Sequence, residues 1–362
     1  MSSSLIIVGE SILYNPSFMD YIMRTLKQHV SFFNSIKLID KNDSNFFIEL
    51  EEMIHKYEQT IVIAQEDSFN FVNKIFSTLD NDNLVLKDNM LIPSKTLVYE
   101  AHSYIMKKDE HLINVMCVNE NETLPQVLIN TAFTSRTFTI VDIDMDSINV
   151  LLEPLCETYE IKINATAIIA GWTCVNAKAN KYGNLENFLK AVKSLFAHKY
   201  IETDNVIQHI TERLEKNEKK ITAVESCTGG LISSMLTKQA GVSSVFDGGL
   251  VTYANTIKES WLGVSAQTLE KYGAVSEACV QEMLDGALQA SHADYALATS
   301  GIAGPSGGSA QKPVGTVFVG AKIAGGLTRI ERLLLHGDRI YIQKQSAYHA
   351  FKLLLQIEKT LF

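Results

Sequence analysis

The chain has 362 residues, of which 46% are hydrophobic and 20% are charged, and its formal net charge at pH 7 is −9. This length suggests two or three domains, and the composition is typical of a soluble globular protein. No apolar run reaches the roughly 18–20 residues of a membrane span, and the N-terminus lacks the basic start of a signal peptide. The scattered cysteines show no metal-ligand spacing, so we expect reduced thiols, no bound metal and a cytoplasmic location.

The excess negative charge lies entirely before residue 204, and residues 204–362 are neutral. Neither part carries a basic stripe, which argues against nucleic acid as a partner. A neutral C-terminal part with local basic positions suits a small anionic substrate instead, and we expect no membrane partner.

Residues 1–133 alternate between strand and helix patterns. The apolar runs Leu5–Val8, Ile36–Ile39 and Thr60–Ala64 predict strands, and Phe18–Gln28 predicts a helix with one apolar face. Strands that alternate with helices are typical of a doubly wound α/β domain with a parallel sheet.

Residues 134–203 predict a small α+β unit with the order strand, helix, strand, strand, helix. The expected elements are Thr137–Ile143, Asp146–Cys156, Tyr159–Ile168, Trp172–Ala179 and Leu185–Phe196. A charged helix between Asp204 and Lys220 then leads into an α/β domain that occupies residues 204–362.

The segment Ile221–Gly230 reads Ile-Thr-Ala-Val-Glu-Ser-Cys-Thr-Gly-Gly. Its β-branched start predicts a buried strand, and Leu231–Leu236 predicts a helix, so Ser226–Thr228 fall in the turn between them. Open α/β sheets place ligands at such turns, and free N–H groups at a helix start bind anions. An ordinary strand–helix turn that holds no ligand would fit the same ten residues.

Three later stretches distinguish these two interpretations. They are Gly249–Asn255, with Lys258 just beyond it, the glycine-rich Ala296–Pro305, and Pro313–Gly320. In this order, and together with Glu225–Gly230, they resemble the C-terminal domain of the competence/damage-inducible protein A (CinA) family. The resemblance covers roughly Asp204–Phe362 and implies deamidation of nicotinamide mononucleotide.

The resemblance also implies what the first two segments are. In this family the N-terminal domain resembles molybdopterin-binding proteins and is associated with ADP-ribose hydrolysis. Gly9–Leu13 follows the family's first motif in part, but Gln65–Phe69 stands where a glycine-rich phosphate loop is expected and contains no glycine. We therefore expect residues 1–133 to be a degenerate domain without pyrophosphatase activity. Residues 134–203 are similar to the family's KH-like bridging domain but lack the Gly-x-x-Gly loop of a nucleic-acid module.

Amide hydrolysis needs a nucleophile, a base and an oxyanion site. The family motif implies Ser226 as nucleophile, with the neighbouring Cys227 as its rival. Lys258 is the expected base, or else a phosphate contact or a surface lysine, and Tyr253 relays a proton or orients Lys258. Thr228, Gly229 and Gly230 offer N–H groups to the oxyanion.

Other residues are expected to hold the substrate. Glu225 anchors the turn or contacts ribose hydroxyls, and the loop after the third strand holds phosphate or ribose through its backbone. Asp338 caps the last helix, and Ser276 caps an earlier one. The remaining expected substrate contacts are Asn255, Ser300, Gly301, Gly304, Lys312 and Arg339.

The resemblance implies no cofactor, a small-molecule substrate and a homodimer. Two other functions remain open at this stage. One is a competence- or damage-response scaffold in which both sites are vestigial, and the other is an ADP-ribose pyrophosphatase that acts through residues 1–133.

Overall fold

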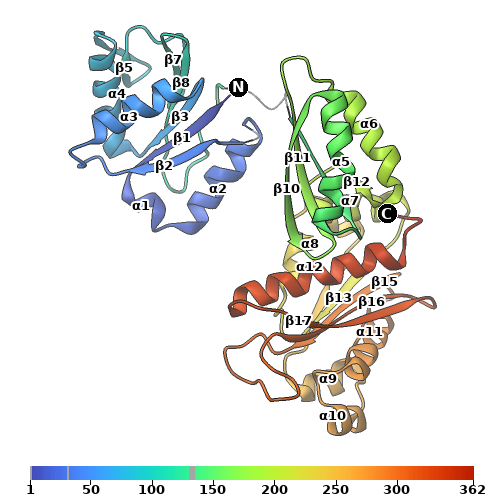
Figure 1. Cartoon of the computed structure of the whole chain (residues 1–362). Helices are drawn as coiled ribbons and strands as arrows, with labels where there is room; N and C mark the ends of the chain where they lie inside the picture. The colour runs from blue at the N-terminus through green and yellow to red at the C-terminus, as the bar shows by residue number, and fades with distance from the viewer. Residues whose placement is uncertain (1, 31, 130–134) are drawn as a thin grey trace. The chain divides into compact units, whose positions relative to one another are not determined.

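The computed structural model describes residues 2–30, 32–129 and 135–362. The chain is a mixed α/β protein that divides into two compact units, Met1–Arg136 and Thr137–Phe362 (Figure 1). Among the helices in the described ranges, none is both long enough and apolar enough to cross a membrane.

The first unit is built around a six-stranded sheet. Its strand order is β2 (Ser35–Ile39), β1 (Ser3–Val8), β3 (Gln59–Ala64), β8 (His111–Cys117), β7 (Ser103–Lys108) and β6 (Val98–Glu100). The first four strands are parallel, and the sequence predicted three of them, β1, β2 and β3, but not β8; β7 and β6 are antiparallel. The prediction of a purely parallel sheet is wrong at this edge because two-residue turns join β6 to β7 and β7 to β8, and a parallel crossover needs a dozen residues or more.

Helices cover both faces of this sheet. Alternation along β1 sends Ile6 and Val8 to one face and Leu5 and Ile7 to the other. The first face packs against α3 (Phe46–Lys56) and α4 (Glu66–Leu79), and the second against α1 (Glu10–Leu13) and α2 (Pro16–Lys27). A hairpin of β4 (Leu84–Lys87) and β5 (Met90–Pro93) packs against α4.

The second unit begins with a four-stranded sheet of order β10 (Ile161–Ile169), β11 (Trp172–Ala179), β9 (Ser135–Val141) and β12 (Tyr200–Ile201). Two helices, α5 (Met145–Tyr159) and α6 (Leu185–Phe196), share its core. The predicted order of strand, helix, strand, strand, helix is therefore confirmed. The short strand β12 was not predicted.

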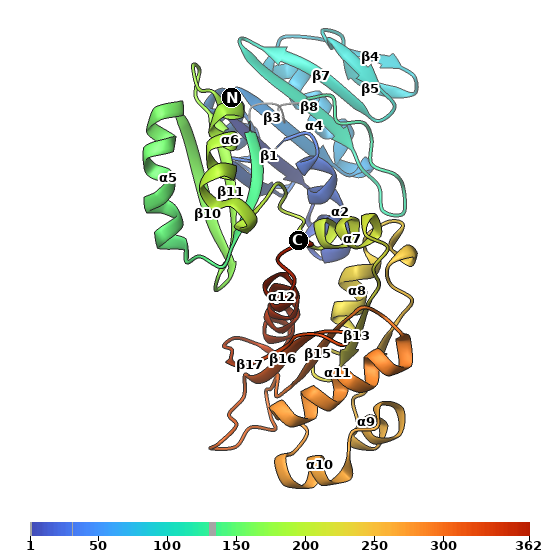
Figure 2. The same cartoon turned by 90° about the vertical axis from the view of Figure 1, so that its right-hand side faces the viewer.

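A five-stranded sheet forms the rest of this unit, in the order β14 (Gly249–Val251), β13 (Ile221–Glu225), β15 (Tyr295–Gly301), β16 (Thr316–Ile323) and β17 (Thr328–Leu334). The first three strands are parallel, and the last two are antiparallel. One face packs on α7 (Val206–Lys216), α8 (Leu231–Thr237) and α12 (Arg339–Ile357). The other packs on α11 (Glu277–Ser291) together with residues from the end of α9 (Asn255–Leu262) and from α10 (Ala266–Tyr272) (Figure 2).

Helix α12 connects the two sheets of the second unit. It packs along the five-stranded sheet and also contacts the β10–β11 hairpin, where the Trp172 and Tyr348 rings lie 5.4 Å apart. Asp338 caps α12, because its Oδ1 accepts the Tyr341 N–H at 2.8 Å, and Ser276 caps α11 in the same way. Both predicted caps are confirmed. The start of α12 lies near the carboxyl ends of the parallel strands, because Arg339 lines the same cavity as Ser226 and Ser300.

Candidate active site

The side chain of Glu225 stabilises the turn between β13 and α8. This carboxylate is fully buried and accepts hydrogen bonds from the N–H groups of Gly230, Ile232 and Ser233 at 2.8–3.0 Å, and from the hydroxyls of Thr228 and Ser233. A negative charge at the start of a helix is stabilised by the unpaired N–H groups and the helix dipole. The carboxylate thus fixes the turn that presents Ser226.

Ser226 lies directly after the strand and beside Lys258. Its N–H donates to the carbonyl of Thr299 at 3.0 Å, which continues the pairing of β13 with β15. Its Oγ lies 3.0 Å from Nζ of Lys258, which comes from the first turn of α9. Two residues 32 positions apart are therefore in hydrogen-bond contact, as expected where parallel strands end at a common edge.

Lys258 is 1% exposed, which is unusual for a lysine. Its Nζ donates to the carbonyls of Thr252 at 2.6 Å and Tyr253 at 3.2 Å in addition to its contact with Ser226. Burial lowers the pKa of this amine, because removal from water disfavours the charged form. A lysine with a lowered pKa in contact with a hydroxyl can exchange a proton with it.

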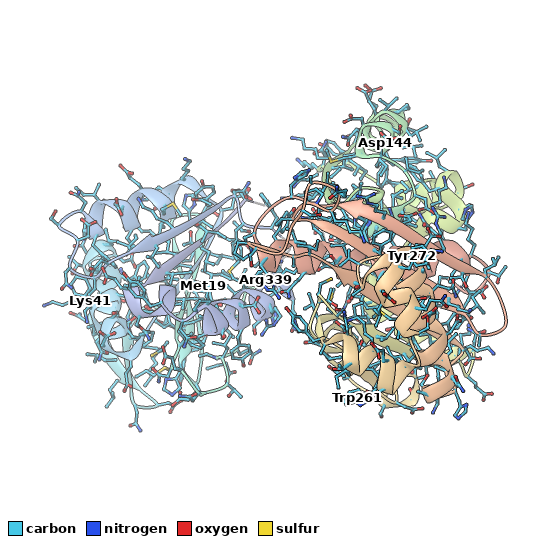
Figure 3. The ribbon with its side chains drawn as sticks, turned by 90° about the horizontal axis from the view of Figure 1, so that it is seen from below. Met19, Lys41, Asp144, Trp261, Tyr272 and Arg339 are labelled. Atoms are coloured by element: carbon cyan, nitrogen blue, oxygen red, sulfur yellow. The ribbon has the colours of Figure 1, made fainter. Side chains whose placement is uncertain are left out.

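Tyr253 and Arg339 lie at the mouth of this site. The Tyr253 carbonyl, and not its hydroxyl, contacts Lys258, and the ring is 63% exposed. Arg339, labelled in Figure 3, begins α12 and donates to the carbonyl of Gly304 at 2.8 Å and to the Tyr253 hydroxyl at 3.3 Å. Tyr253 thus orients Lys258 through its backbone, and its side chain belongs with Arg339.

A cavity of about 200 Å³ opens beside Ser226 and Lys258. Among the residues that the structure describes, its lining includes no carboxylate, and neither Lys258 nor Arg339 forms an ion pair. The Arg339 guanidinium, which stays charged and has no acidic partner, favours a negatively charged ligand. The lining residues are Ser226, Cys227, Tyr253, Asn255, Lys258, Ala274, Val275, Ser300, Gly301, Ala303 and Arg339.

The strand end and loop after β15 form another wall. Ser300 lines the cavity, and its Oγ donates to the carbonyl of Ala274 at 2.7 Å. Gly301 is required by packing, since a Cβ there would lie 2.7–2.9 Å from Val317 and Thr316. Gly304 has φ +82°, and its carbonyl accepts from Arg339. These contacts place the loop against the cavity with its backbone partly exposed.

Several predicted substrate contacts have other partners. Glu225 and Thr228 bond to each other, the Gly229 N–H donates to the Ser226 carbonyl at 3.2 Å, and the Gly230 N–H donates to Glu225. Lys312 does not line the cavity. Its Nζ donates instead to the carbonyl of Tyr272 at 2.9 Å.

The sequence did not single out Ala274, Val275 or Ala303 as cavity residues, nor Gln343, whose amide donates to the carbonyl of Cys227 at 2.7 Å. The first three are small apolar residues without a chemical signature. Gln343 lies four residues after Arg339, so a helix brings both to one side, which is the signal that could have revealed it.

Cys227 differs from Ser226 in its chemistry. It is 4% exposed, and burial raises the pKa of its thiol to about 12. Because the thiolate is the reactive form, a thiol with so high a pKa is a poor nucleophile near neutral pH. The Ser226 hydroxyl, by contrast, is in contact with the amine of Lys258, and this contact favours the serine.

Comparison with known proteins places the chain in a family. Residues 203–357 match the family model described as the CinA C-terminal domain. The nicotinamide-nucleotide amidohydrolase PncC of Enterobacter agglomerans is 49% identical over 136 residues, which are 38% of this chain and 83% of that protein. The chain belongs to the CinA family. A solved structure of the competence/damage inducible protein CihA from Agrobacterium tumefaciens is 38% identical, covers 42% of this chain and 95% of its own, and has a TM-score of 0.40.

Likeness to the family extends beyond the C-terminal part. A CinA-like protein of Leptospira biflexa serovar Patoc is 36% identical over 210 residues, more than the family model matches, so the likeness reaches residues before 203. These residues are 58% of this chain and 50% of that relative. The chain spans about half the length of the curated CinA-like proteins it matches, or less.

Proposed function

We propose that the C-terminal part of this CinA-family chain hydrolyses the carboxamide of nicotinamide mononucleotide to nicotinic acid mononucleotide and ammonia. The observation that carries the proposal is the 3.0 Å contact between the Ser226 Oγ and the Nζ of a fully buried lysine. The likeness to a nicotinamide-nucleotide amidohydrolase supports the choice of substrate. The Arg339 guanidinium, which lines the cavity without an acidic partner among the described residues, suits its phosphate group.

The surroundings of Lys258 suit a general base. A neutral amine has two N–H groups and one lone pair. In the structure Nζ donates to the Ser226 Oγ and to the carbonyls of Thr252 and Tyr253. When the amine is neutral, the two carbonyls can accept its two N–H groups, and its lone pair can then accept the Ser226 hydroxyl proton. The same contacts can hold the ammonium form after it takes the proton.

The reaction then proceeds in two steps. Lys258 takes the hydroxyl proton of Ser226 as Oγ attacks the carboxamide carbon, and the tetrahedral intermediate expels ammonia after Lys258 returns the proton to the nitrogen. Water, deprotonated by Lys258, attacks the resulting ester, which releases the carboxylate and restores Ser226. Each step uses the lysine as base and then as acid.

The oxyanion is assigned to the N–H groups of Cys227 and Thr228. Within the described part of the chain neither N–H donates to another residue, and the Cys227 N–H contacts only the thiol of its own side chain, whereas those of Gly229 and Gly230 are already donated. The residue after the nucleophile is a common oxyanion donor in enzymes with a strand–turn–helix nucleophile. Arg339 and Asn255 at the cavity mouth are the proposed phosphate contacts. Ser300 and Gly301 form the neighbouring wall, and Gly304 does not line the cavity but holds Arg339 through its carbonyl.

The direct test measures ammonia release from nicotinamide mononucleotide by the purified chain. Ser226→Ala should lower kcat by more than about 10³-fold, because the nucleophile is lost. It should leave the melting temperature nearly unchanged, since only one hydroxyl is removed. Cys227→Ala is the matched control and should retain most of the activity. Near-normal turnover by Ser226→Ala together with loss of activity in Cys227→Ala would show that the serine is not the nucleophile.

We propose three domains, at 1–133, 134–203 and 204–362, a homodimer, and a cytoplasmic location in keeping with an intracellular nucleotide substrate. We propose that residues 1–133 lack ADP-ribose hydrolase activity, since Gln65 is followed at once by α4 and not by a glycine loop. The intact contact of Ser226 with Lys258 argues against a vestigial scaffold.

A further inference from the structure

The peptide that follows Ser226 is held by a side chain from the other end of the domain. The carbonyl of Cys227 accepts a hydrogen bond from the Gln343 amide at 2.7 Å, although the two residues are 116 positions apart. The neighbouring carbonyls of Ser226 and Thr228 accept N–H groups of the turn itself, from Gly229 and Leu231. The Cys227–Thr228 peptide is therefore the part of this turn that α12 fixes.

From this contact we propose that Gln343 is a positioning residue for the nucleophile and the oxyanion donors, an inference that rests on the proposed amide hydrolysis. A trans peptide directs its C=O and its following N–H to opposite sides. By fixing the Cys227 carbonyl, Gln343 also fixes the direction of the Thr228 N–H. Because a carbonyl can only accept, the amide nitrogen of Gln343 is the atom that faces it.

Gln343 is itself held in place by its helix. It lies one turn after Arg339, so both side chains leave the same face of α12 and reach the site. Ile342 is 1% exposed and anchors this turn of the helix in the core, and Asp338 caps its start. The helix start thus connects two parts of the site, since Arg339 holds the loop at Gly304 and Gln343 holds the turn at Cys227.

Gln343 should affect the rate of catalysis and not substrate binding. It does not line the cavity and does not contact Lys258 among the described residues, so neither substrate affinity nor the lysine pKa depends on it directly. A misplacement of reacting atoms by about 1 Å can lower a rate by about 100-fold. Loss of the amide donor should therefore lower kcat by about 10- to 100-fold, change KM by no more than about twofold, and leave the acid limb of the pH profile in place.

The test compares Gln343→Leu and Gln343→Glu, both of which lose the donor, with Gln345→Leu. Gln345 is the matched control, because its amide also donates from α12 to a carbonyl, that of His336 at 3.1 Å, away from the turn. Ammonia release from nicotinamide mononucleotide gives kcat and KM. The rate at which a fluorophosphonate labels Ser226, followed by intact mass, gives a readout that does not depend on the natural substrate.

The expected result is a fall in kcat and in the labelling rate for both Gln343 variants, with Gln345→Leu close to wild type. Activity of the Gln343 variants within about twofold of wild type would overturn the inference, as would a raised KM with unchanged kcat, an equal loss in Gln345→Leu, or unfolding of both Gln343 variants. If the wild type releases no ammonia, the proposed function fails and the labelling rates still decide the role of Gln343. A wild type that neither releases ammonia nor is labelled at Ser226 overturns both.

Discussion

In the first unit, a cavity of about 360 Å³ lies at the carboxyl ends of β1, β2 and β3, and in the second, the cavity beside Ser226 lies at the carboxyl ends of β13, β14 and β15. Both positions follow from the same rule of open α/β sheets, which places ligand sites where parallel strands end. The two cavities differ in whether their charged side chains are paired with an opposite charge. Topology therefore supplies a location, and the side chains decide whether it can bind an anion.

In the first cavity, polar side chains of the lining bond to one another. Lys41, labelled in Figure 3, forms an ion pair with Asp67, and this contact holds the pKa of that carboxyl below its ordinary value. The Ser11 hydroxyl donates to Gln65. Glu10 and Asp40 add further negative charge to the lining. A phosphate entering this cavity would meet carboxylates, and the nearby cation already has a partner.

The strand–helix turns differ in the same way. Gly229 and Gly230 adopt φ values of +63° and +99°. This backbone conformation places two glycines between the Ser226–Thr228 turn and the start of α8, and the Glu225 carboxylate accepts the first N–H groups of the helix. After β3, by contrast, Gln65 passes directly into α4, and its carbonyl accepts the N–H groups of Ser68 and Phe69. Glycine at positive φ is thus what makes room for a nucleophile at one strand end and not at the other.

The largest expected effect separates the lysines of the two cavities. Lys258→Arg should lower kcat for nicotinamide mononucleotide by about 10²–10⁴-fold, because guanidinium keeps the charge but cannot act as a base. Lys41→Arg is the matched control and should leave kcat unchanged, since Lys41 only pairs with Asp67. Retained kcat with raised KM in Lys258→Arg would show a phosphate-binding lysine and remove the proposed base.

The pH dependence of the wild type follows from the lowered pKa of Lys258. The lysine acts only when neutral, so kcat/KM should rise with pH as Nζ loses its proton and level off above its pKa. Because burial lowers this pKa, the acid limb should lie below the roughly 10.4 of a free lysine. A rise that continues to the pKa of a free lysine would contradict the buried environment described for Nζ.

Much of this site could be predicted from sequence, because the relevant residues directly follow strands. Ser226, Asn255 and Ser300 each stand at or just after the carboxyl end of a parallel strand, and such ends converge whatever the rest of the fold does. Lys258 could be placed for the same reason, since it lies one turn into the following helix. Local patterns thus locate residues that short-range geometry brings to a common edge.

The remainder depends on long-range packing. Sequence spacing does not show that Gln343 reaches Cys227, that Ala274 lies opposite Ser300, or that Lys312 bonds to Tyr272. These contacts arise because α12 and the loop after α10 fold back on the sheet. The antiparallel strands β6 and β7 were also missed, because the short turns that reverse them contain neither Gly nor Pro.

A smaller effect concerns stability and contrasts Glu225 with Asp67. Glu225→Gln should destabilise the second unit by about 2–3 kcal/mol, because a buried carboxylate that accepts five hydrogen bonds is replaced by a group with one acceptor oxygen. Asp67→Asn should cost less than about 1 kcal/mol in the first unit, because its ion pair is exposed. Urea unfolding of both variants measures the difference, and equal losses would contradict the idea that only one carboxylate supports a strand–helix turn.

The smallest expected effect concerns Lys312, which the sequence placed among the substrate contacts. In the structure its Nζ donates to the carbonyl of Tyr272, and its backbone N–H donates to Ser309, so it ties the glycine-rich loop to the end of α10.

A phosphate contact predicts that Lys312→Met raises KM at least about tenfold with kcat unchanged. A tie between loops predicts changes in both constants within about threefold and a stability loss of about 1 kcal/mol. We expect the second result, measured by steady-state ammonia release and thermal unfolding, with Lys322→Met as a control for loss of one charge on the same domain. A tenfold rise in KM confined to Lys312→Met would add a second cation, beside Arg339, to the proposed anion-binding cavity and widen its contrast with the cavity of the first unit, where Lys41 is paired with Asp67.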